Sequence, residues 1–166
     1  MSFDIFGSAT ERLGNSVTLR IEAPVAAVWD LVSDVTRIGE FSPETFEAEW
    51  LKGADGPELG ARFRGHVKRN QKGPTYWSSC EVTHCEPNRS FGFAVLVKGK
   101  PINNWRYDLD KDGASTNITE SFQLEPTLAN KIYWVAVGRW RGETNRRGMQ
   151  ATLEAMKKLL EAPHAP

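Results

Sequence analysis

The chain has 166 residues, enough for one domain with a hydrophobic core and too few to suggest two. Hydrophobic residues make up 40% and charged residues 25%, which is ordinary for a globular protein and excludes a disordered one. The 21 Lys and Arg residues balance the 21 Asp and Glu residues, so no strong overall field would direct the protein to nucleic acid or to an anionic membrane. Without a run of about 18 apolar residues, no membrane-spanning helix is expected.

The N-terminal residues do not place a basic segment before a continuous apolar stretch, so we predict no signal peptide and a cytoplasmic location. The two cysteines, Cys80 and Cys85, are an odd number of residues apart within one predicted strand. Alternation along a strand would point them to opposite faces, so we expect no local disulfide between them.

The first predicted element is a half-buried strand at residues 15–22, where apolar and polar side chains alternate. Pro24 ends this strand and suits the first turn of a helix. Residues 25–33 then place apolar side chains at helical spacing, which predicts a short amphipathic helix. Asp34 is placed to cap a second short helix over residues 35–41.

Beyond residue 43 the chain changes to short alternating segments separated by turns rich in Gly, Pro, Asn and Asp. Six further strands are predicted, covering residues 46–51, 61–68, 75–85, 90–98, 102–110 and 115–125. Short turns between successive strands predict one antiparallel meander.

Residues 127–140 are too apolar for an ordinary linker and would form either a helix or an irregular flap. A lid over a pocket, a dimer contact and simply packed structure are the alternatives for this segment. Residues 141–161 are strongly helical, with one continuous apolar stripe that comprises Met149, Thr152, Leu153, Met156, Leu159 and Leu160.

Together these elements predict an α+β fold in which a curved antiparallel sheet of about seven strands closes around the long C-terminal helix. Two short helices follow the first strand. The helix is the only element long enough to cover the apolar face of the sheet, and a curved sheet around it leaves room for a cavity. We therefore predict an N-terminal extension (residues 1–14), one domain (residues 15–161) and a tail (residues 162–166).

This pattern resembles the START-like, Bet v 1-like (SRPBCC) superfamily with its helix-grip fold, and more narrowly its bacterial polyketide cyclase/dehydrase-type proteins. The segments that carry the resemblance are APVAAVWDL at residues 23–31, FSPE at 41–44, GARFRG at 60–65, TNITESF at 116–122 and the closing helix at 149–161. The superfamily includes carriers of hydrophobic ligands, cyclases and ligand domains of hydroxylases. It has no shared catalytic motif, so the resemblance implies no catalytic residue here.

Glu120 is the best catalytic candidate. Counting by twos places it on one face with Ile118 and Phe122, which points its carboxyl group inward. Burial would raise its pKa toward the range used in general acid–base catalysis. Two alternatives remain, namely an ion pair with an arginine such as Arg106, or a one-residue bulge that turns Glu120 outward.

The inward faces of the predicted strands and helix supply the candidates for a ligand pocket. Trp105 and Tyr107 share one strand face, and Ser78 and Cys80 share another with Tyr76, Val82 and His84. Cys80 lacks a histidine at a spacing diagnostic of a nucleophile, which favours a small buried residue. The full candidate set is Tyr76, Ser78, Cys80, Trp105, Tyr107, Glu120, Phe122, Trp134, Met149 and Leu153.

We predict no metal site and no cofactor. The three histidines, His66, His84 and His164, have no paired ligand spacing, and no dinucleotide, phosphate-loop or esterase motif occurs. Basic residues at 62–69 fit the solvent face of a sheet, whereas those at 139–147 could bind an anionic ligand or a partner.

Three functions follow as alternatives: binding of an apolar, lipid-like or polyketide-like metabolite in the internal cavity, a cyclase or dehydratase that uses acid–base groups there, and a regulatory or interaction module without turnover. For the binding protein and for the enzyme, the predicted partner is a small apolar molecule. We predict no nucleic-acid partner. The oligomeric state stays open, with a homodimer as one alternative.

Overall fold

The computed structural model describes residues 13–163, apart from the side chains of Asn70, Trp134 and Arg139. One sheet of seven strands, all antiparallel to their neighbours, forms the body of the molecule in the order β1-β7-β6-β5-β4-β3-β2. The strands are β1 (Gly14–Ile21), β2 (Thr45–Trp50), β3 (Arg62–Val67), β4 (Tyr76–Glu86), β5 (Ser90–Val97), β6 (Lys100–Asp112) and β7 (Ser115–Leu124). The predicted α+β helix-grip architecture is confirmed.

Two short helices carry the chain from one edge of the sheet to the other. After β1, α2 (Val25–Ser33) and the 3-10 helix η2 (Val35–Glu40) lead to β2 at the opposite edge. The side chain of Asp34 accepts a hydrogen bond from the backbone N–H of Thr36 at 3.0 Å, as the predicted cap requires. From β2 onward the sheet returns strand by strand, with one further 3-10 turn, η3 (Arg69–Gln71), between β3 and β4.

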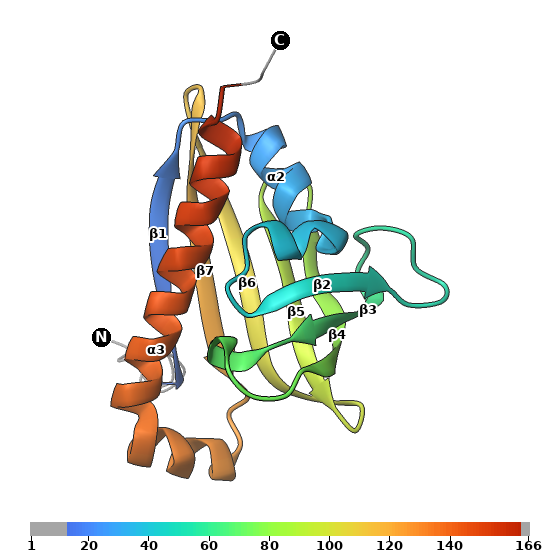
Figure 1. Cartoon of the computed structure of the whole chain (residues 1–166), viewed down its shortest axis with the longest axis vertical. Helices are drawn as coiled ribbons and strands as arrows, with labels where there is room; N and C mark the ends of the chain where they lie inside the picture. Colours follow the sequence, from blue (N-terminus) through green and yellow to red (C-terminus); the bar gives the residue numbers. More distant parts are fainter. Residues whose placement is uncertain (1–12, 164–166) are drawn as a thin grey trace, which may run out of the picture.

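The long helix α3 (Leu128–Glu161) covers one face of the sheet. It packs mainly on β1 and β7, while α2 closes the sheet beside it (Figure 1). Met149, Leu153 and Met156 are fully buried in this interface, as the apolar stripe predicts. Leu159 is an exception, because at 100° per residue it lies at the margin of the stripe and stays exposed.

The start of α3 decides between the two alternatives for residues 127–140, a helix and an irregular flap. Residues 127–140 are not an irregular flap, because α3 begins at Leu128, where the side chain of Thr127 accepts a hydrogen bond from the N–H of Asn130 at 3.1 Å. Figure 1 shows these first turns running across the lower end of the sheet before α3 turns along β1 and β7. Leu128, Ile132 and Val135 of these turns are exposed, so they are not part of the buried stripe that contains Met149.

A bulge in β4 changes which side chains face inward. The register of β4 against β5 shifts between Val82 and His84, so Cys85 lies opposite Phe91 on the inner face, together with Cys80. The prediction that the two cysteines point to opposite faces is therefore wrong, and so is the placement of His84 beside Cys80. The expectation of no disulfide is confirmed, since both thiols are free.

Gly14 allows a close approach of β1 to β7. A Cβ atom at this position would lie 2.0 Å from the backbone oxygen of Phe122, whereas one at Gly148 in α3 would meet nothing within 4 Å. We expect Gly14→Ala to lower the free energy of unfolding by ~1–3 kcal/mol through overpacking. Gly148→Ala is the matched control and is expected to raise it by ~0.5–1 kcal/mol, because Ala favours the helix.

Urea unfolding followed by circular dichroism measures both changes. If Gly14→Ala is as stable as the wild type, the β1–β7 contact is not as close as described.

Candidate functional site

The centre of the candidate site is a carboxyl–phenol pair on the concave face of the sheet. Tyr107 of β6 and Glu120 of β7 are directly opposite one another in the antiparallel register, so both side chains project from the same face. The hydroxyl of Tyr107 donates a hydrogen bond to Oε1 of Glu120 at 3.1 Å. Only 3% of Glu120 and 5% of Tyr107 is exposed, which makes this pair part of the interior.

Both alternatives to an inward Glu120 are excluded by this geometry. Arg106 lies on the outer face of β6, where its guanidinium binds Asp108 at 2.7 Å, so it is not the partner of Glu120. The β6–β7 register runs without a shift from Asn103 to Asp112, so no bulge turns Glu120 outward.

Burial raises the pKa of both groups. It raises the pKa of Glu120 to about 8, and the hydrogen bond from Tyr107 opposes that rise. The pKa of Tyr107 is raised well above its ordinary value, first by burial and then by the neighbouring Glu120. Near neutral pH, Glu120 is therefore largely a neutral carboxylic acid. Its Oε2 atom has no hydrogen-bond partner within the described part of the chain.

Two asparagines that sequence reasoning missed lie on the same face. Asn15 is opposite Phe122 in the β1–β7 pair, and Asn103 is opposite Leu124 in the β6–β7 pair. The amide nitrogen of Asn15 donates to the backbone oxygen of Gly142 in α3 at 2.6 Å. The Oδ1 atoms of both asparagines are buried and, among residues 13–163, have no hydrogen-bond partner.

We call Asn15, Asn103, Tyr107 and Glu120 the interior polar set. The register places its members around an aromatic pair, Trp105 and Phe122, whose ring centroids are 4.8 Å apart. The alternation that identified Glu120 also applies to these asparagines. Asn15 continues the inward series of β1, and Asn103 continues the series that contains Trp105 and Tyr107.

The other predicted pocket residues surround this set to different degrees. Cys80, Phe122, Met149 and Leu153 are buried, Ser78 and Trp105 are half-buried, and Tyr76 is exposed near the start of β4. Trp134 belongs to the first turns of α3, and its side chain lies outside the described residues. The structure thus brings most candidates to one face and leaves Tyr76 at its margin.

Cys80 is poorly suited to act as a nucleophile. Burial raises the pKa of its thiol to about 12, and only a weak contact to the backbone oxygen of Ser78, at 3.8 Å, opposes this rise. Nucleophilic attack requires the thiolate, which is scarce at neutral pH under these conditions. Cys80 serves as a small apolar side chain in the core.

The described histidines lie away from the interior polar set. His66 binds Glu47 at 2.7 Å and stacks on Trp77 with centroids 4.4 Å apart, on the outer face of β3 and β4. His84 is on the outer face beside Gly92, and His164 lies outside the described residues. Within residues 13–163 no three His, Cys, Asp or Glu side chains gather in a way that could hold a metal ion.

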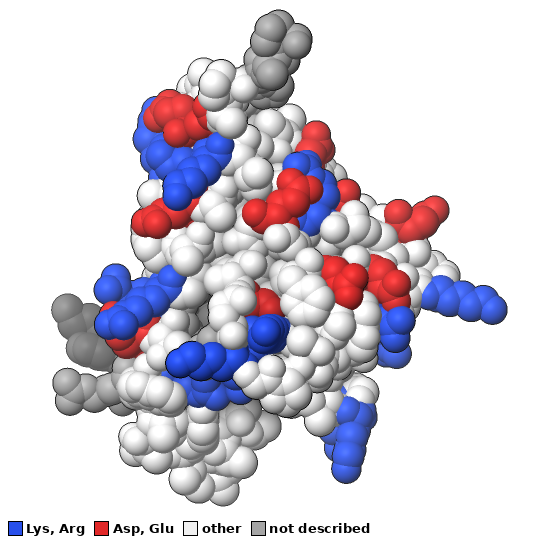
Figure 2. All heavy atoms as spheres, in the orientation of Figure 1, with Lys and Arg blue, Asp and Glu red and all other residues white. Residues whose placement is uncertain are grey.

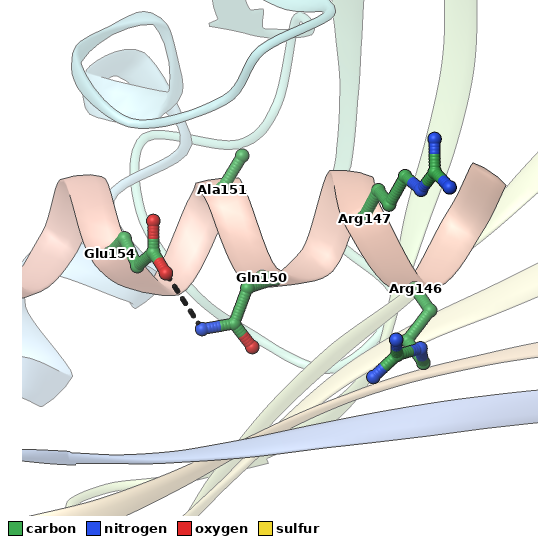
Figure 3. A pocket seen from close by; sticks show the side chains of 5 residues that line it. All are labelled: Arg146, Arg147, Gln150, Ala151 and Glu154. Carbon is green, nitrogen blue, oxygen red and sulfur yellow. Dashed lines mark hydrogen bonds between the residues drawn. The ribbon is translucent and has the colours of Figure 1, made fainter. Parts of the chain in front are cut away.

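A hollow separates α3 from η3 on the face drawn in Figure 2, in front of the strands β6 and β7 that Figure 1 draws behind it. A depression of about 270 Å³ lies along α3 and is lined by Arg146, Arg147, Gln150, Ala151 and Glu154. Figure 3 shows Arg147 and Ala151 pointing away from β1, and Arg146 and Gln150 pointing toward it. Arg147 and Ala151 therefore face the side of α3 on which the hollow opens.

A second depression of about 270 Å³ lies near the β5–β6 hairpin and is lined by Leu51, Arg62, Ser79, Cys80, Leu96, Lys98 and Gly99. Neither depression is lined by Glu120 or Tyr107. The interior polar set is thus separated from both surface depressions.

Residues 15–161 match the protein family described as polyketide cyclase/dehydrase and lipid transport. The chain belongs to this family. A comparison with curated proteins finds no match.

Solved structures share this fold. A Polyketide_cyc-like protein from Corynebacterium glutamicum is 27% identical, with a TM-score of 0.57 over 93% of this chain and 97% of its own. A protein from Nitrosomonas europaea is 11% identical, with a TM-score of 0.66 over 91% of this chain and 96% of its own. The di-domain ARO/CYC StfQ of the steffimycin biosynthetic pathway is 15% identical, with a TM-score of 0.62 over 89% of this chain and 44% of its own.

The raised pKa of Glu120 makes the stability of this family member depend on pH. The folded chain holds a proton on Glu120 up to about pH 8, whereas the unfolded chain releases it near the ordinary value of 4.5. This contribution to stability is fully present below the unfolded pKa and is lost as the pH rises through the folded pKa. Relative to Glu120→Gln, we expect the wild type to lose ~4 kcal/mol between about pH 5 and about pH 9.

Urea unfolding at a series of pH values measures this difference. Glu58→Gln, which removes an exposed carboxyl group in the β2–β3 loop, is the matched control and is expected to keep the wild-type pH dependence. Parallel pH profiles for the wild type and Glu120→Gln would contradict the buried, protonated state of Glu120.

Proposed function

We propose that this protein binds an apolar small molecule with a neutral polar group, between the concave face of the sheet and α3. The observation that carries the proposal is the interior polar set. Three of its buried oxygen atoms, Oδ1 of Asn15, Oδ1 of Asn103 and Oε2 of Glu120, have no hydrogen-bond partner within the described part of the chain. Buried polar atoms usually have partners, and a ligand group would provide them.

The surroundings of the set suit an apolar ligand body. Phe91, Phe93, Phe122, Met149 and Leu153 are buried on the inner side of the sheet and helix. A mostly apolar wall with a few convergent polar groups is the usual composition of small-molecule sites. Such a wall gives affinity by burying ligand surface, and the polar groups fix the orientation of the ligand.

The protonation of Glu120 selects the charge of the ligand. As a neutral acid, Glu120 offers a donor at Oε2, and the two asparagine oxygens offer acceptors. A hydroxyl or carbonyl group can use these positions. An ionised carboxylate would be placed near acceptor atoms without a described cation beside them, and its burial would be unfavourable. We therefore propose a neutral oxygenated ligand rather than a fatty-acid anion.

A ligand could enter through the hollow between α3 and η3 (Figure 2) only if side chains there move, because neither surface depression is lined by the interior polar set. The hollow opens in front of β6 and β7, which carry Asn103, Tyr107 and Glu120. The family description, which combines polyketide cyclase/dehydrase with lipid transport, supports an apolar ligand of this class.

Naphthol and methylnaphthalene test this function as probes of similar size, only one of which carries a hydroxyl group. We expect the wild type to bind naphthol ~10-fold more tightly, because its hydroxyl group satisfies buried polar atoms. Asn103→Leu should remove most of this preference and leave methylnaphthalene binding unchanged. Asn104→Leu is the matched control, since Asn104 is the next residue of β6 and lies on the outer face.

Quenching of intrinsic tryptophan fluorescence measures binding of both probes. The proposal is wrong if neither probe binds, or if the preference for naphthol persists in both Asn103→Leu and Glu120→Gln.

A cyclase or dehydratase activity is the second candidate, and the pKa of about 8 for Glu120 is the observation that favours it. A carboxyl group with a pKa close to neutral can both donate and accept a proton, and Tyr107 holds it in place. If this activity exists, Glu120→Gln is expected to lower the turnover of a poly-β-carbonyl substrate ~100-fold or more, since general acid–base catalysis contributes at least that much.

Affinity for the substrate should change little, because Gln keeps the shape of the side chain. The measurement is the rate of product formation by liquid chromatography, and equal rates for Glu120→Gln and the wild type would leave ligand binding as the function.

A further inference from the structure

The first turns of α3 expose an apolar stripe to solvent. Leu128, Ile132 and Val135 are spaced i, i+4 and i+7, which places them on one side of the helix. Their exposed fractions are 75%, 64% and 89%. On a helix that only packs against its own domain, such a stripe would face the core. In this part of α3 the apolar side faces solvent instead.

Two exposed aromatic side chains lie on a neighbouring side of the same turns. Tyr133 and Trp140 are exposed, and Arg141 connects them. The Nε of Arg141 donates to the hydroxyl of Tyr133 at 2.7 Å, and its guanidinium lies 5.9 Å from the ring centroid of Trp140. We call Leu128, Ile132, Tyr133, Val135 and Trp140 the α3 tip.

The charged residues within the segment that forms the α3 tip are all basic, and Glu125 and Glu143 flank this segment. The sequence from Pro126 to Gly142 includes Lys131 and Arg141 and contains no Asp or Glu, although acidic and basic residues are balanced over the whole chain. None of the ion pairs found among the described residues involves Lys131 or Arg141. Figure 2 shows the lower end of the molecule as mostly uncharged, with Lys and Arg side chains near it.

The apolar surface continues onto the sheet beside the helix. The backbone N–H of Glu125 donates to the oxygen of Ile102 at 3.1 Å, and the oxygen of Glu125 accepts from the amide of Asn130 at 2.9 Å. These bonds hold the start of α3 against the start of β6. Ile102 is itself exposed, and Lys100 precedes it in the same strand.

Charge decides which partner fits this surface. In a symmetric dimer formed through the α3 tip, both copies would contribute the same basic residues, Lys131 and Arg141, to one interface, which is electrostatically unfavourable. An anionic lipid surface supplies both the opposite charge and an apolar layer. Helices with basic residues beside exposed Leu, Ile and aromatic side chains bind at such interfaces, where Trp and Tyr are favoured.

We propose that the α3 tip docks the protein on the surface of a membrane that contains anionic lipids. Leu128, Ile132 and Val135 enter the boundary between headgroups and acyl chains, while Lys131 and Arg141 lie among the headgroups. No described helix is both long and apolar enough to cross a bilayer, so this contact is peripheral. The proposal does not depend on the ligand site, since none of the interior polar set belongs to the α3 tip.

Flotation with vesicles tests the proposal. We expect the full chain to float with vesicles of phosphatidylcholine and phosphatidylglycerol. Its affinity for vesicles of phosphatidylcholine alone should be at least ~10-fold lower. Val135→Glu should weaken binding to the mixed vesicles ~10-fold or more, because a carboxylate replaces an inserted apolar group. Leu59→Glu is the matched control: Leu59 is 68% exposed in the β2–β3 loop, away from the α3 tip, and this variant should bind as the wild type does.

A second pair of variants tests the electrostatic part. Lys131→Glu should weaken binding ~5-fold or more, whereas Lys111→Glu in the β6–β7 hairpin, at the opposite end of the molecule, should have little effect. Circular dichroism checks that all four variants keep the fold, which their exposed positions favour.

Three results would overturn the proposal. One is equal binding of Val135→Glu and Leu59→Glu to the mixed vesicles, and another is binding that does not depend on phosphatidylglycerol. The third is a wild-type dimer in analytical ultracentrifugation that Val135→Glu dissociates, which would assign the α3 tip to a second copy of the chain.

Discussion

The structure depends on covering the apolar inner face of a seven-stranded sheet with one long helix. From β2 to β7 each strand pairs with the next along the chain, and burial of the inner side chains of the sheet requires a second layer. Met149, Leu153 and Met156 of α3 provide it over β1 and β7, and α2 closes the sheet beside them. Because the sheet curves around the side that α3 covers, polar groups such as Glu120 can lie inside without reaching solvent, and their properties follow from that enclosure.

Much of this fold could be predicted from alternation along the chain. Strands that keep a strict period of two, such as β1 and β7, reveal their inner faces directly, and Glu120 was identified in this way. The prediction failed where one extra residue entered a strand. The bulge after Val82 moved Cys85 to the inner face, and no local signal marks such a residue, because the bulge reflects pairing with β5. The choice between helix and flap for residues 127–140 stayed open in the sequence, because the exposed residues Leu128, Ile132 and Val135 do not face the core.

The sequence predicted which residues of the candidate site point inward, but it did not predict which of them contact one another. Alternation shows that Tyr107 and Glu120 each point inward, but only the register of β6 against β7 places them opposite one another. Asn15 and Asn103 were overlooked although they lie in the same alternating series. These asparagines matter because their Oδ1 atoms have no hydrogen-bond partner in the described part of the chain. Only the three-dimensional structure can show that a partner is missing.

The attachment of α3 along one side has a mechanical consequence. Asn15 binds the backbone of Gly142, Lys157 donates to the oxygen of Arg20 at 2.9 Å, and the N–H of Glu22 donates to Glu161 at 2.6 Å. All three bonds join the helix to β1 or to the residue after it, and they are spread over most of its length. The opposite side of α3 borders the hollow seen in Figure 2. Because these bonds all lie along β1, a rotation of α3 about that edge would widen the hollow while keeping the bonds.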